Sequence, residues 1–309
     1  MKSKRIPYLW AYIVSLVLVT SILYVLLDAF LIPKSLVVMD PKENTVCDVT
    51  PGGTQVDKIV DVSATDYSES QTIVYKSIKI EKIQENGYVY YVADIQLSNP
   101  AYLRTAFAKN TFGRNINQYT STIAKNNNAI LAINGDFYGF REKGLIIRNS
   151  KLYRDNPRSP IDNRTMIIDK KGDFKFVTEG EVSGESLIAD GVTQSFSFGP
   201  VLIENSKLVD TSKQYWVAAK ANPRVGIGQL GPLHYLFVVV DGRTGTSDGM
   251  TLPELAQIFY KRGAIMAYNL DGGGSSTMFY NGKVINRPTT DGTNIGERGV
   301  SDIIYIVGK

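Results

Sequence analysis

The first strong pattern in the sequence is an unbroken apolar run near its amino end. From Tyr8 to Leu27 the chain reads YLWAYIVSLVLVTSILYVLL and contains no charged side chain. A helix of about 20 residues matches the roughly 30 Å hydrocarbon core of a bilayer, and Trp10 and Tyr12 fall where an interfacial aromatic belt lies. The pattern therefore predicts one membrane-spanning helix.

A cleavable signal peptide is the alternative interpretation of this run. Its apolar region is typically about 7–15 residues long and ends in a small-x-small site. The run here is longer, and its exit from Asp28 to Pro33 lacks such a site, which favours an uncleaved anchor. Because Lys2, Lys4 and Arg5 precede the run, the positive-inside rule predicts a single-pass cell-membrane protein with a cytoplasmic amino terminus and an extracellular carboxy-terminal domain.

The hydrophobic pattern divides the chain into an anchor at 1–32, a linker at 33–70 and an outer domain at 71–309. Residues 33–70 are rich in Asp, Thr, Ser, Gly and Pro and show no sustained periodicity, so we expect an extracellular stalk. Cys47 lies in this linker and is the only cysteine, so it has no partner for a disulfide within the chain.

Short segments of alternating or β-branched apolar residues dominate the outer domain. Thr72–Ile83 and Tyr88–Leu97 flank the turn residues Asn86 and Gly87, which predicts a hairpin. Further strands are expected at Ala129–Ile133, Thr165–Asp169, Phe174–Thr178, Pro200–Glu204, Arg224–Gln229, Tyr235–Asp241, Ala264–Leu270 and Asp302–Val307, with a hairpin at Thr277–Ile285.

Two helices are signalled within the outer domain. Asn115–Asn126 carries an apolar face, and Thr251–Glu254 is a capping box that opens a helix stopping at Gly263. Because strands outnumber helices, the expected fold class is α+β, with a mixed or antiparallel β-sheet, few helices and one preceding transmembrane helix.

Composition and charge narrow the classes of function. The 309 residues are 43% hydrophobic and 21% charged, which is typical of a globular protein. The net charge is +4, and the three basic residues before the anchor supply most of it. The outer domain is therefore nearly neutral and lacks the clustered Lys and Arg that nucleic-acid binding requires, so no nucleic-acid partner is expected.

The densest group of polar residues is Asn269–Thr277 (NLDGGGSST), at the end of a predicted buried strand. Consecutive glycines allow positive φ and close approach of the backbone to a ligand, and N–H groups beside hydroxyls suit a phosphate. A simple glycine-rich turn is the alternative, but Asn269 and Asp271 beside it favour a site. ATP and NAD are disfavoured, because the loop leads into a hairpin and carries no lysine.

Four more segments carry Asn, Asp or Arg, in three of them beside Gly, mostly at the end or start of a predicted strand. Each alone is consistent with a charged surface turn, but together they suggest one site built at the edge of a sheet. Arg243 in the first of them suits bidentate binding of a phosphate. The segments are Asp241–Gly249 (DGRTGTSDG), Asn134–Phe140 (NGDFYGF), Asn222–Arg224 (NPR) and Gly296–Gly299 (GERG). His234, the only histidine, lies in a turn, and no pattern places it in a triad or zinc site.

These segments resemble sequence blocks of the phosphodiester glycosidase family. They occur in the same order as in that family, across roughly residues 71–309. Its animal member is the uncovering enzyme, an N-acetylglucosamine-1-phosphodiester alpha-N-acetylglucosaminidase, and bacterial members are associated with exopolysaccharide production. The resembling blocks are AINGDFY (Ala132–Tyr138), NPRVGIG (Asn222–Gly228), DGRTGTSDGMTLPELA (Asp241–Ala256), NLDGGGSSTM (Asn269–Met278) and GERGVSD (Gly296–Asp302).

The resemblance implies hydrolysis of a sugar-1-phosphodiester at the anomeric carbon, which releases a sugar and a phosphomonoester. Since a phosphomonoester is a good leaving group, one carboxylate could suffice to activate water. Asp271 or Glu297 is expected to be that carboxylate, with Asp136 as the other candidate. The residues expected to bind the phosphate or the sugar are Arg243, Arg224, Asn134, Asn269, Gly273, Gly274, Ser275, Ser276, Asp241 and Arg298.

Two other functions stay open at this point. One is a non-catalytic binding or assembly factor for a phosphate-linked surface polysaccharide, although several carboxylates around a phosphate cradle would repel such a ligand. The other is a glycosyl transferase acting on the same linkage. No cofactor is assured by the sequence, but loops containing Asp241, Asp248 and Asp271 could hold a cation such as Ca²⁺.

Overall fold

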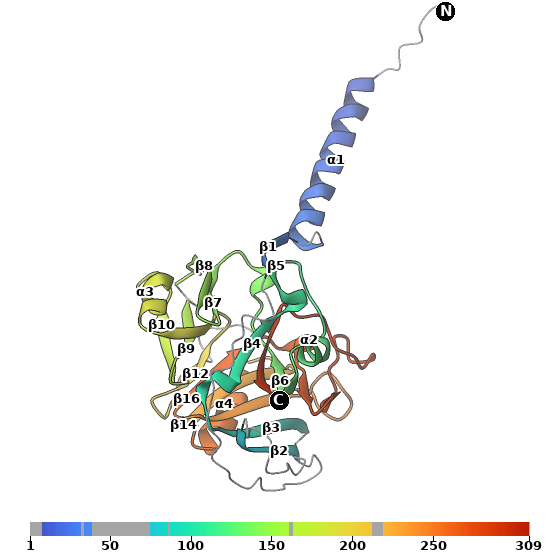
Figure 1. Cartoon of the computed structure of the whole chain (residues 1–309). Coiled ribbons are helices and arrows are strands. Elements are labelled where there is room, and N and C mark those ends of the chain that lie inside the picture. The colour runs from blue at the N-terminus through green and yellow to red at the C-terminus, as the bar shows by residue number, and fades with distance from the viewer. Residues whose placement is uncertain are drawn as a thin grey trace, which may run out of the picture.

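The computed structural model describes residues 8–31, 34–38, 75–85, 87–160, 163–211 and 219–308 (Figure 1). Most of the expected linker, including Cys47, lies outside the described residues. Its beginning differs from the expectation of a stalk, because Lys34–Val38 forms strand β1, which pairs antiparallel with β5 (Thr111–Arg114) of the outer domain.

The apolar run forms helix α1, which extends away from the rest of the chain (Figure 1). It covers Leu9–Phe30, or 22 residues, and at about 1.5 Å per residue this is long enough to cross a bilayer. The segment Trp10–Asp28 has the length and composition of a membrane span, and none of it is buried. The exposed apolar surface is consistent with the predicted anchor.

Two antiparallel sheets form the body of the outer domain, and the expected α+β class is confirmed. One sheet has seven strands in the order β13-β12-β16-β14-β15-β3-β2, and the other has five in the order β18-β17-β6-β19-β4. Their bounds are β2 (Tyr75–Glu85), β3 (Tyr88–Leu97), β4 (Leu103–Phe107), β6 (Ala129–Asn134), β12 (Val201–Glu204), β13 (Lys207–Leu208), β14 (Arg224–Gly231), β15 (His234–Val240), β16 (Met266–Leu270), β17 (Met278–Tyr280), β18 (Lys283–Val284) and β19 (Asp302–Val307).

The main hydrophobic core lies between these two sheets. It joins Ile95 and Phe237 of the seven-stranded sheet to Ile133 and Ile304 of the five-stranded sheet, all of them buried. Smaller elements pack around this pair of sheets. They are α2 (Thr120–Asn126), α3 (Gly184–Ala189), β7 (Gly144–Arg148), β8 (Lys151–Asn156), β9 (Arg164–Asp169), β10 (Phe174–Thr178) and β11 (Val192–Phe196).

Helix α4 (Leu252–Lys261) covers the outer face of the seven-stranded sheet and confirms its predicted capping box. The Glu254 backbone N–H donates to the Thr251 hydroxyl, while the Thr251 N–H donates to the Glu254 carboxylate at 2.8 Å. The helix packs closely because β14 carries glycines beneath it: a Cβ at Gly226 or Gly228 would lie 2.7 Å from the Phe259 ring.

The predicted helix at Asn115–Asn126 starts later than expected, at Thr120. Asn115 has a φ of 57°, which is outside the helical region, and Gln118 pairs instead with Val300. Strands β4, β5, β7, β8 and β11 were not predicted from the sequence.

Candidate active site

Segments at the ends of four strands meet at the glycine loop. The Asp271 N–H after β16 donates to the carbonyl of Gly135 after β6, at 3.3 Å. The Gly273 N–H donates to the carbonyl of Pro223 before β14, at 2.8 Å. Arg298, shortly before β19, donates its N–H to the Gly274 carbonyl at 3.3 Å. Both sheets therefore contribute to one cluster of loops, as the sequence pattern suggested.

The loop has no room for side chains at its glycines. A Cβ at Gly272 would lie 2.7 Å from the Pro223 carbonyl oxygen, and one at Gly274 would lie 2.3 Å from the Thr290 hydroxyl. Gly273 has a φ of 61° and lies against the Arg243 guanidinium, 3.2 Å from where its Cβ would be. The glycines thus allow neighbouring segments to approach the Asp271 loop closely.

Asp271 lies in this cluster with its side chain 13% exposed. Its Oδ2 is 3.4 Å from Nη2 of Arg298, which also donates to the Ser275 hydroxyl at 2.8 Å. Burial raises the pKa of the Asp271 carboxyl, while the Ser275 hydroxyl and the charges of Arg298 and Arg141 act in the opposite direction. The carboxylate is therefore flanked by positive charge and still reachable from solvent.

Arg141 is a site residue that the sequence reasoning missed. It follows the short 3-10 helix η4 (Tyr138–Phe140), and its Nη1 donates to the Ser197 carbonyl at 3.2 Å. Its guanidinium lies 5.5 Å from the Phe137 ring centre and 4.8 Å from that of Phe198, which are cation–π distances. The available sequence signal was an Arg beside aromatic residues, directly after the block containing Asp136.

The two arginines predicted to hold phosphate occupy different environments. Arg243 is exposed and donates to the Thr290 carbonyl at 2.6 Å and to the Asn222 side chain at 3.2 Å. Arg224 is buried and donates to the carbonyls of Met250 and Lys220, at 2.9 and 2.7 Å. Burial, with the nearby charge of Arg243, lowers the pKa of Arg224 to about 10. Arg224 thus holds loops together, while Arg243 faces the glycine loop.

Asn134 joins β6 to the glycine loop. Its side-chain amide donates to the Asp271 carbonyl at 2.7 Å, and its Oδ1 accepts from the Thr277 N–H at 3.1 Å. Asn269 donates to the Gly199 carbonyl at 2.7 Å. Within the described residues, Oδ1 of Asn269 and the hydroxyl of Ser276 are buried without a hydrogen-bond partner. Asn134 is thus arranged to orient Asp271.

Asp241 is buried beside the segment that follows β18. Its Oδ1 accepts from the Asn286 amide at 2.9 Å and from the Arg287 N–H at 3.0 Å, and burial raises its pKa.

Among the described residues, no group of three or more His, Cys, Asp or Glu side chains is placed to hold a metal ion. A Ca²⁺ site at the loops of Asp241, Asp248 and Asp271 therefore stays a prediction without structural support.

Glu297 turns toward α2 instead of Asp271. Its Oε1 accepts from the Ser121 N–H at 2.9 Å, and its Oε2 accepts from the Ser121 hydroxyl. A carboxylate that reaches the first turn of a helix from another segment accepts hydrogen bonds from its free N–H groups and complements the helix dipole. Both carboxylate oxygens of Glu297 are thus engaged.

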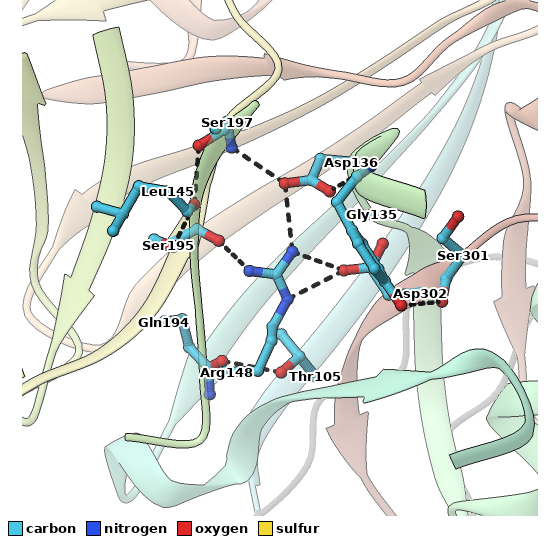
Figure 2. A network of polar contacts seen from close by, with 12 residues as sticks. Thr105, Gly135, Asp136, Leu145, Arg148, Gln194, Ser195, Ser197, Ser301 and Asp302 are labelled. Atoms are coloured by element: carbon cyan, nitrogen blue, oxygen red, sulfur yellow. Dashed lines mark hydrogen bonds and ion pairs between the residues drawn. The ribbon is translucent and has the colours of Figure 1, made fainter. Parts of the chain in front are cut away.

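Asp136 belongs to a buried ionic network (Figure 2). Arg148 lies between Asp136 and Asp302, with Nη2 at 3.2 Å from one carboxylate and 2.7 Å from the other, and all three side chains are at most 1% exposed. Asp136 also accepts from the N–H groups of Tyr138 and Ser197, both at 3.0 Å. Its oxygens are therefore fully occupied within the fold.

The network places two carboxylates around one guanidinium, so negative charge is in excess if both carboxylates are ionised. This excess affects the pKa of Asp302. Burial raises the pKa of Asp302 and the charge of Asp136 adds to this, while Arg148 opposes both. The sequence reasoning missed Arg148 and Asp302 as partners. The available signal was a charged residue ending the apolar run Leu145–Ile147 of β7, because a buried charge requires a partner.

His234 lies at the start of β15, where its Nε2 is 2.7 Å from Oδ1 of Asp94. It is thus paired with a carboxylate of β3 in the seven-stranded sheet.

The chain is similar to known sequences over much of its outer domain. A sequence model of the phosphodiester glycosidase family matches residues 127–307. The SPbeta prophage-derived uncharacterized protein YomE of Bacillus subtilis (strain 168) is 32% identical over 201 residues. These residues are 63% of the present chain but only 30% of that relative, so the chain spans under a third of the relative's length.

Two solved structures share the fold. The zebrafish N-acetylglucosamine-1-phosphodiester alpha-N-acetylglucosaminidase catalytic domain, auto-inhibited by its pro-peptide, has a TM-score of 0.60 and 19% identity, over 77% of this chain and 85% of that one. A hypothetical protein from Synechocystis has a TM-score of 0.54 and 16% identity, over 74% and 63% of the two chains.

Proposed function

The chain belongs to the phosphodiester glycosidase family, and we propose that it is a membrane-anchored extracellular hydrolase of sugar-1-phosphodiester linkages in a surface glycan or exopolysaccharide. The family and fold support a glycosidase-type function. One observation carries the finer assignment: Asp271 is a carboxylate still open to solvent, and arginines border it.

In this proposal the Asp271 carboxylate activates a water molecule at the anomeric carbon. The water oxygen bonds to that carbon, one water proton passes to Asp271, and the bond between the carbon and the phosphate oxygen breaks. The leaving phosphate keeps the electron pair, and Asp271 later returns its proton to solvent. The products are a free sugar and a phosphomonoester, whose low basicity removes the need for a second carboxylic acid.

Arginines near the glycine loop stabilise the departing phosphate. Arg298 lies against Asp271 and Ser275, and Arg243 lies against Gly273. Guanidinium groups bind phosphate through paired, charge-assisted hydrogen bonds, and such groups act most strongly when the fold has already oriented them. Arg243 is oriented in this way by the Thr290 carbonyl.

Asp136 and Glu297 take positioning roles in the same proposal. Asp136 is buried against Arg148, and both oxygens of Glu297 bind Ser121. The proposal therefore gives neither carboxylate the role of activating water. Arg224, which holds the Met250 and Lys220 carbonyls, likewise positions the loops around the phosphate.

The test uses the full chain in detergent micelles and a synthetic N-acetylglucosamine-1-phosphodiester. Mass spectrometry should detect free sugar and phosphomonoester, and Asp271→Asn should release neither. Binding without any product would instead identify a glycan-binding protein, and transfer of the sugar to an added acceptor would identify a transferase. Either outcome would overturn the hydrolase assignment.

A further inference from the structure

The end of the predicted anchor is tied closely to the outer domain. Only residues 32 and 33 separate Leu31, the last described residue after α1, from β1, and such a connection spans at most about 11 Å. β1 then pairs with β5, with Lys34 opposite Arg114 and Val38 opposite Thr111. The side-chain amide of Asn115 also lies 3.4 Å from the carbonyl oxygen of Asp28 in α1. The domain therefore begins where the membrane span ends.

The strand that receives the anchor is in contact with one wall of the candidate site. The N–H of Asn115 donates to the Gly139 carbonyl at 3.0 Å, and Arg114 pairs with Glu142 at 2.6 Å. A Cβ at Gly139 would lie 3.3 Å from the Gly113 carbonyl oxygen. Residues 136–142, which we call the shared segment, thus contact β5 or the residue that follows it at Gly139 and Glu142.

The shared segment also supplies residues around Asp271. Its first residue, Asp136, follows Gly135, whose carbonyl accepts from the Asp271 N–H. Arg141 contributes positive charge beside Asp271. Phe137 and Phe140 stack with ring centres 4.7 Å apart, and both are half-buried. In Figure 1, α1 leaves the domain beside β1 and β5, whereas the β2–β3 hairpin lies at the opposite end of the domain.

We propose that the site faces the membrane surface and that its substrate is a sugar-1-phosphodiester whose phosphate carries a lipid held in that membrane. The inference rests on the proposed function. An anchor fixed to β5 holds the shared segment near the lipid headgroups, so the anomeric bond of a lipid-linked sugar phosphate lies within reach of Asp271. Arginine is also a residue that the charged surface of a membrane attracts.

The first experiment measures the orientation without using activity. The full chain carrying Cys47→Ser receives one new labelled cysteine, either Lys143→Cys beside the shared segment or Gln84→Cys on the β2–β3 hairpin, both at exposed positions. Each variant is reconstituted into phosphatidylcholine vesicles containing an acceptor-labelled lipid. Energy transfer should be several-fold stronger from position 143. Equal transfer, or stronger transfer from position 84, would overturn the inference.

The second experiment compares two synthetic substrates that differ only in the alkyl chain on phosphate, one long enough to insert into the vesicles and one water-soluble. A variant with a flexible Gly-Ser spacer of about 20 residues between Pro33 and Lys34 should cleave the soluble substrate at the original rate. Its rate on the inserted substrate should fall about tenfold. Unchanged or faster cleavage of the inserted substrate would overturn the inference while leaving the proposed function standing. If neither the original chain nor the spacer variant cleaves either substrate, the proposed function and the inference are both contradicted.

Discussion

Asp136 and Asp271 each follow the last residues of a strand, one in each of the two sheets. Their sequence contexts are alike, yet their surroundings in the fold differ. In sequence, Asn134 and Gly135 precede Asp136 at the end of β6, and Asn269 and Leu270 precede Asp271 at the end of β16. Asp136 is buried against Arg148 and two backbone N–H groups. Asp271 keeps an exposed edge and a longer contact to Arg298. The number of partners separates a carboxylate that holds the fold from one available for chemistry.

The largest expected effect is the loss of hydrolysis in Asp271→Asn. Removing a general base typically lowers the rate by about 10²–10⁴-fold. Folding should be retained, because the neutral amide removes a charge that burial disfavours. Steady-state kinetics and thermal unfolding measure the two effects. Normal turnover by this variant would place the reacting carboxylate elsewhere.

Substitutions in the buried network of Arg148, Asp136 and Asp302 should mainly lower the stability of the fold. Arg148→Met leaves two buried carboxylates without their cation and should destabilise the fold by about 3–5 kcal/mol, measured by urea unfolding. Asp302→Asn is the matched control and should cost less, because one carboxylate then remains for one guanidinium. An Arg148→Met protein as stable as the original chain would show that the network does not hold the fold.

Arg298→Gln tests the charge beside Asp271. The variant loses a donor to the leaving phosphate, and loss of one such oriented donor typically lowers the rate by about 10²-fold. Arg262→Gln, which loses an ion pair with Glu81 at the β2 edge of the seven-stranded sheet, is the control and should leave kcat/KM unchanged. Equal activity in the two variants would argue against a role for Arg298 at the site.

The pH dependence of kcat/KM reports on Asp271 directly. Asp271 acts in its ionised form, and burial holds its pKa above the ordinary value of about 3.9. Activity should therefore fall with decreasing pH, with a midpoint above that value. Arg298→Gln should move the midpoint to higher pH, because the lost positive charge had favoured the ionised carboxylate. A midpoint that stays fixed or moves lower would contradict this.

The smallest expected effect lies far from both carboxylates, at the cap of α4. Thr251→Ala removes the acceptor of the Glu254 N–H and should cost about 1 kcal/mol of unfolding free energy. Hydrolysis should not change, since α4 packs on the outer face of the seven-stranded sheet. A large loss of activity in this variant would show that the site depends on general stability more than on its own residues.

Much of the fold could be predicted because its signals are local. The β2–β3 hairpin has a turn sequence between regular strands, and α4 has a cap and a stop within a few residues. Strands β7 and β8 pair with each other, but their turn, Asn149–Ser150, carries no glycine to mark a hairpin in the sequence. Strand β11 was missed because its partner, β9, lies well before it in the chain. The bond from Arg148 at the end of β7 to Asp302 likewise joins residues far apart in sequence.

The site was predictable as a set of segments but not as a set of roles. Glycine-flanked polar residues correctly marked the loops that converge at Asp271. Sequence could not show that Glu297 binds Ser121 of α2 or that the charge of Arg141 acts on Asp271, because both depend on tertiary packing. Burial, which separates Asp136 from Asp271, is likewise a property of the assembled sheets.

Hydrolysis in ¹⁸O-labelled water tests the central claim most directly. If Asp271 directs water to the anomeric carbon, the label enters the released sugar and the phosphomonoester stays unlabelled. The Asp271→Asn variant should release no labelled sugar. Label in the phosphomonoester would mean that water attacks phosphorus, and the protein would then be a phosphodiesterase instead of a glycosidase.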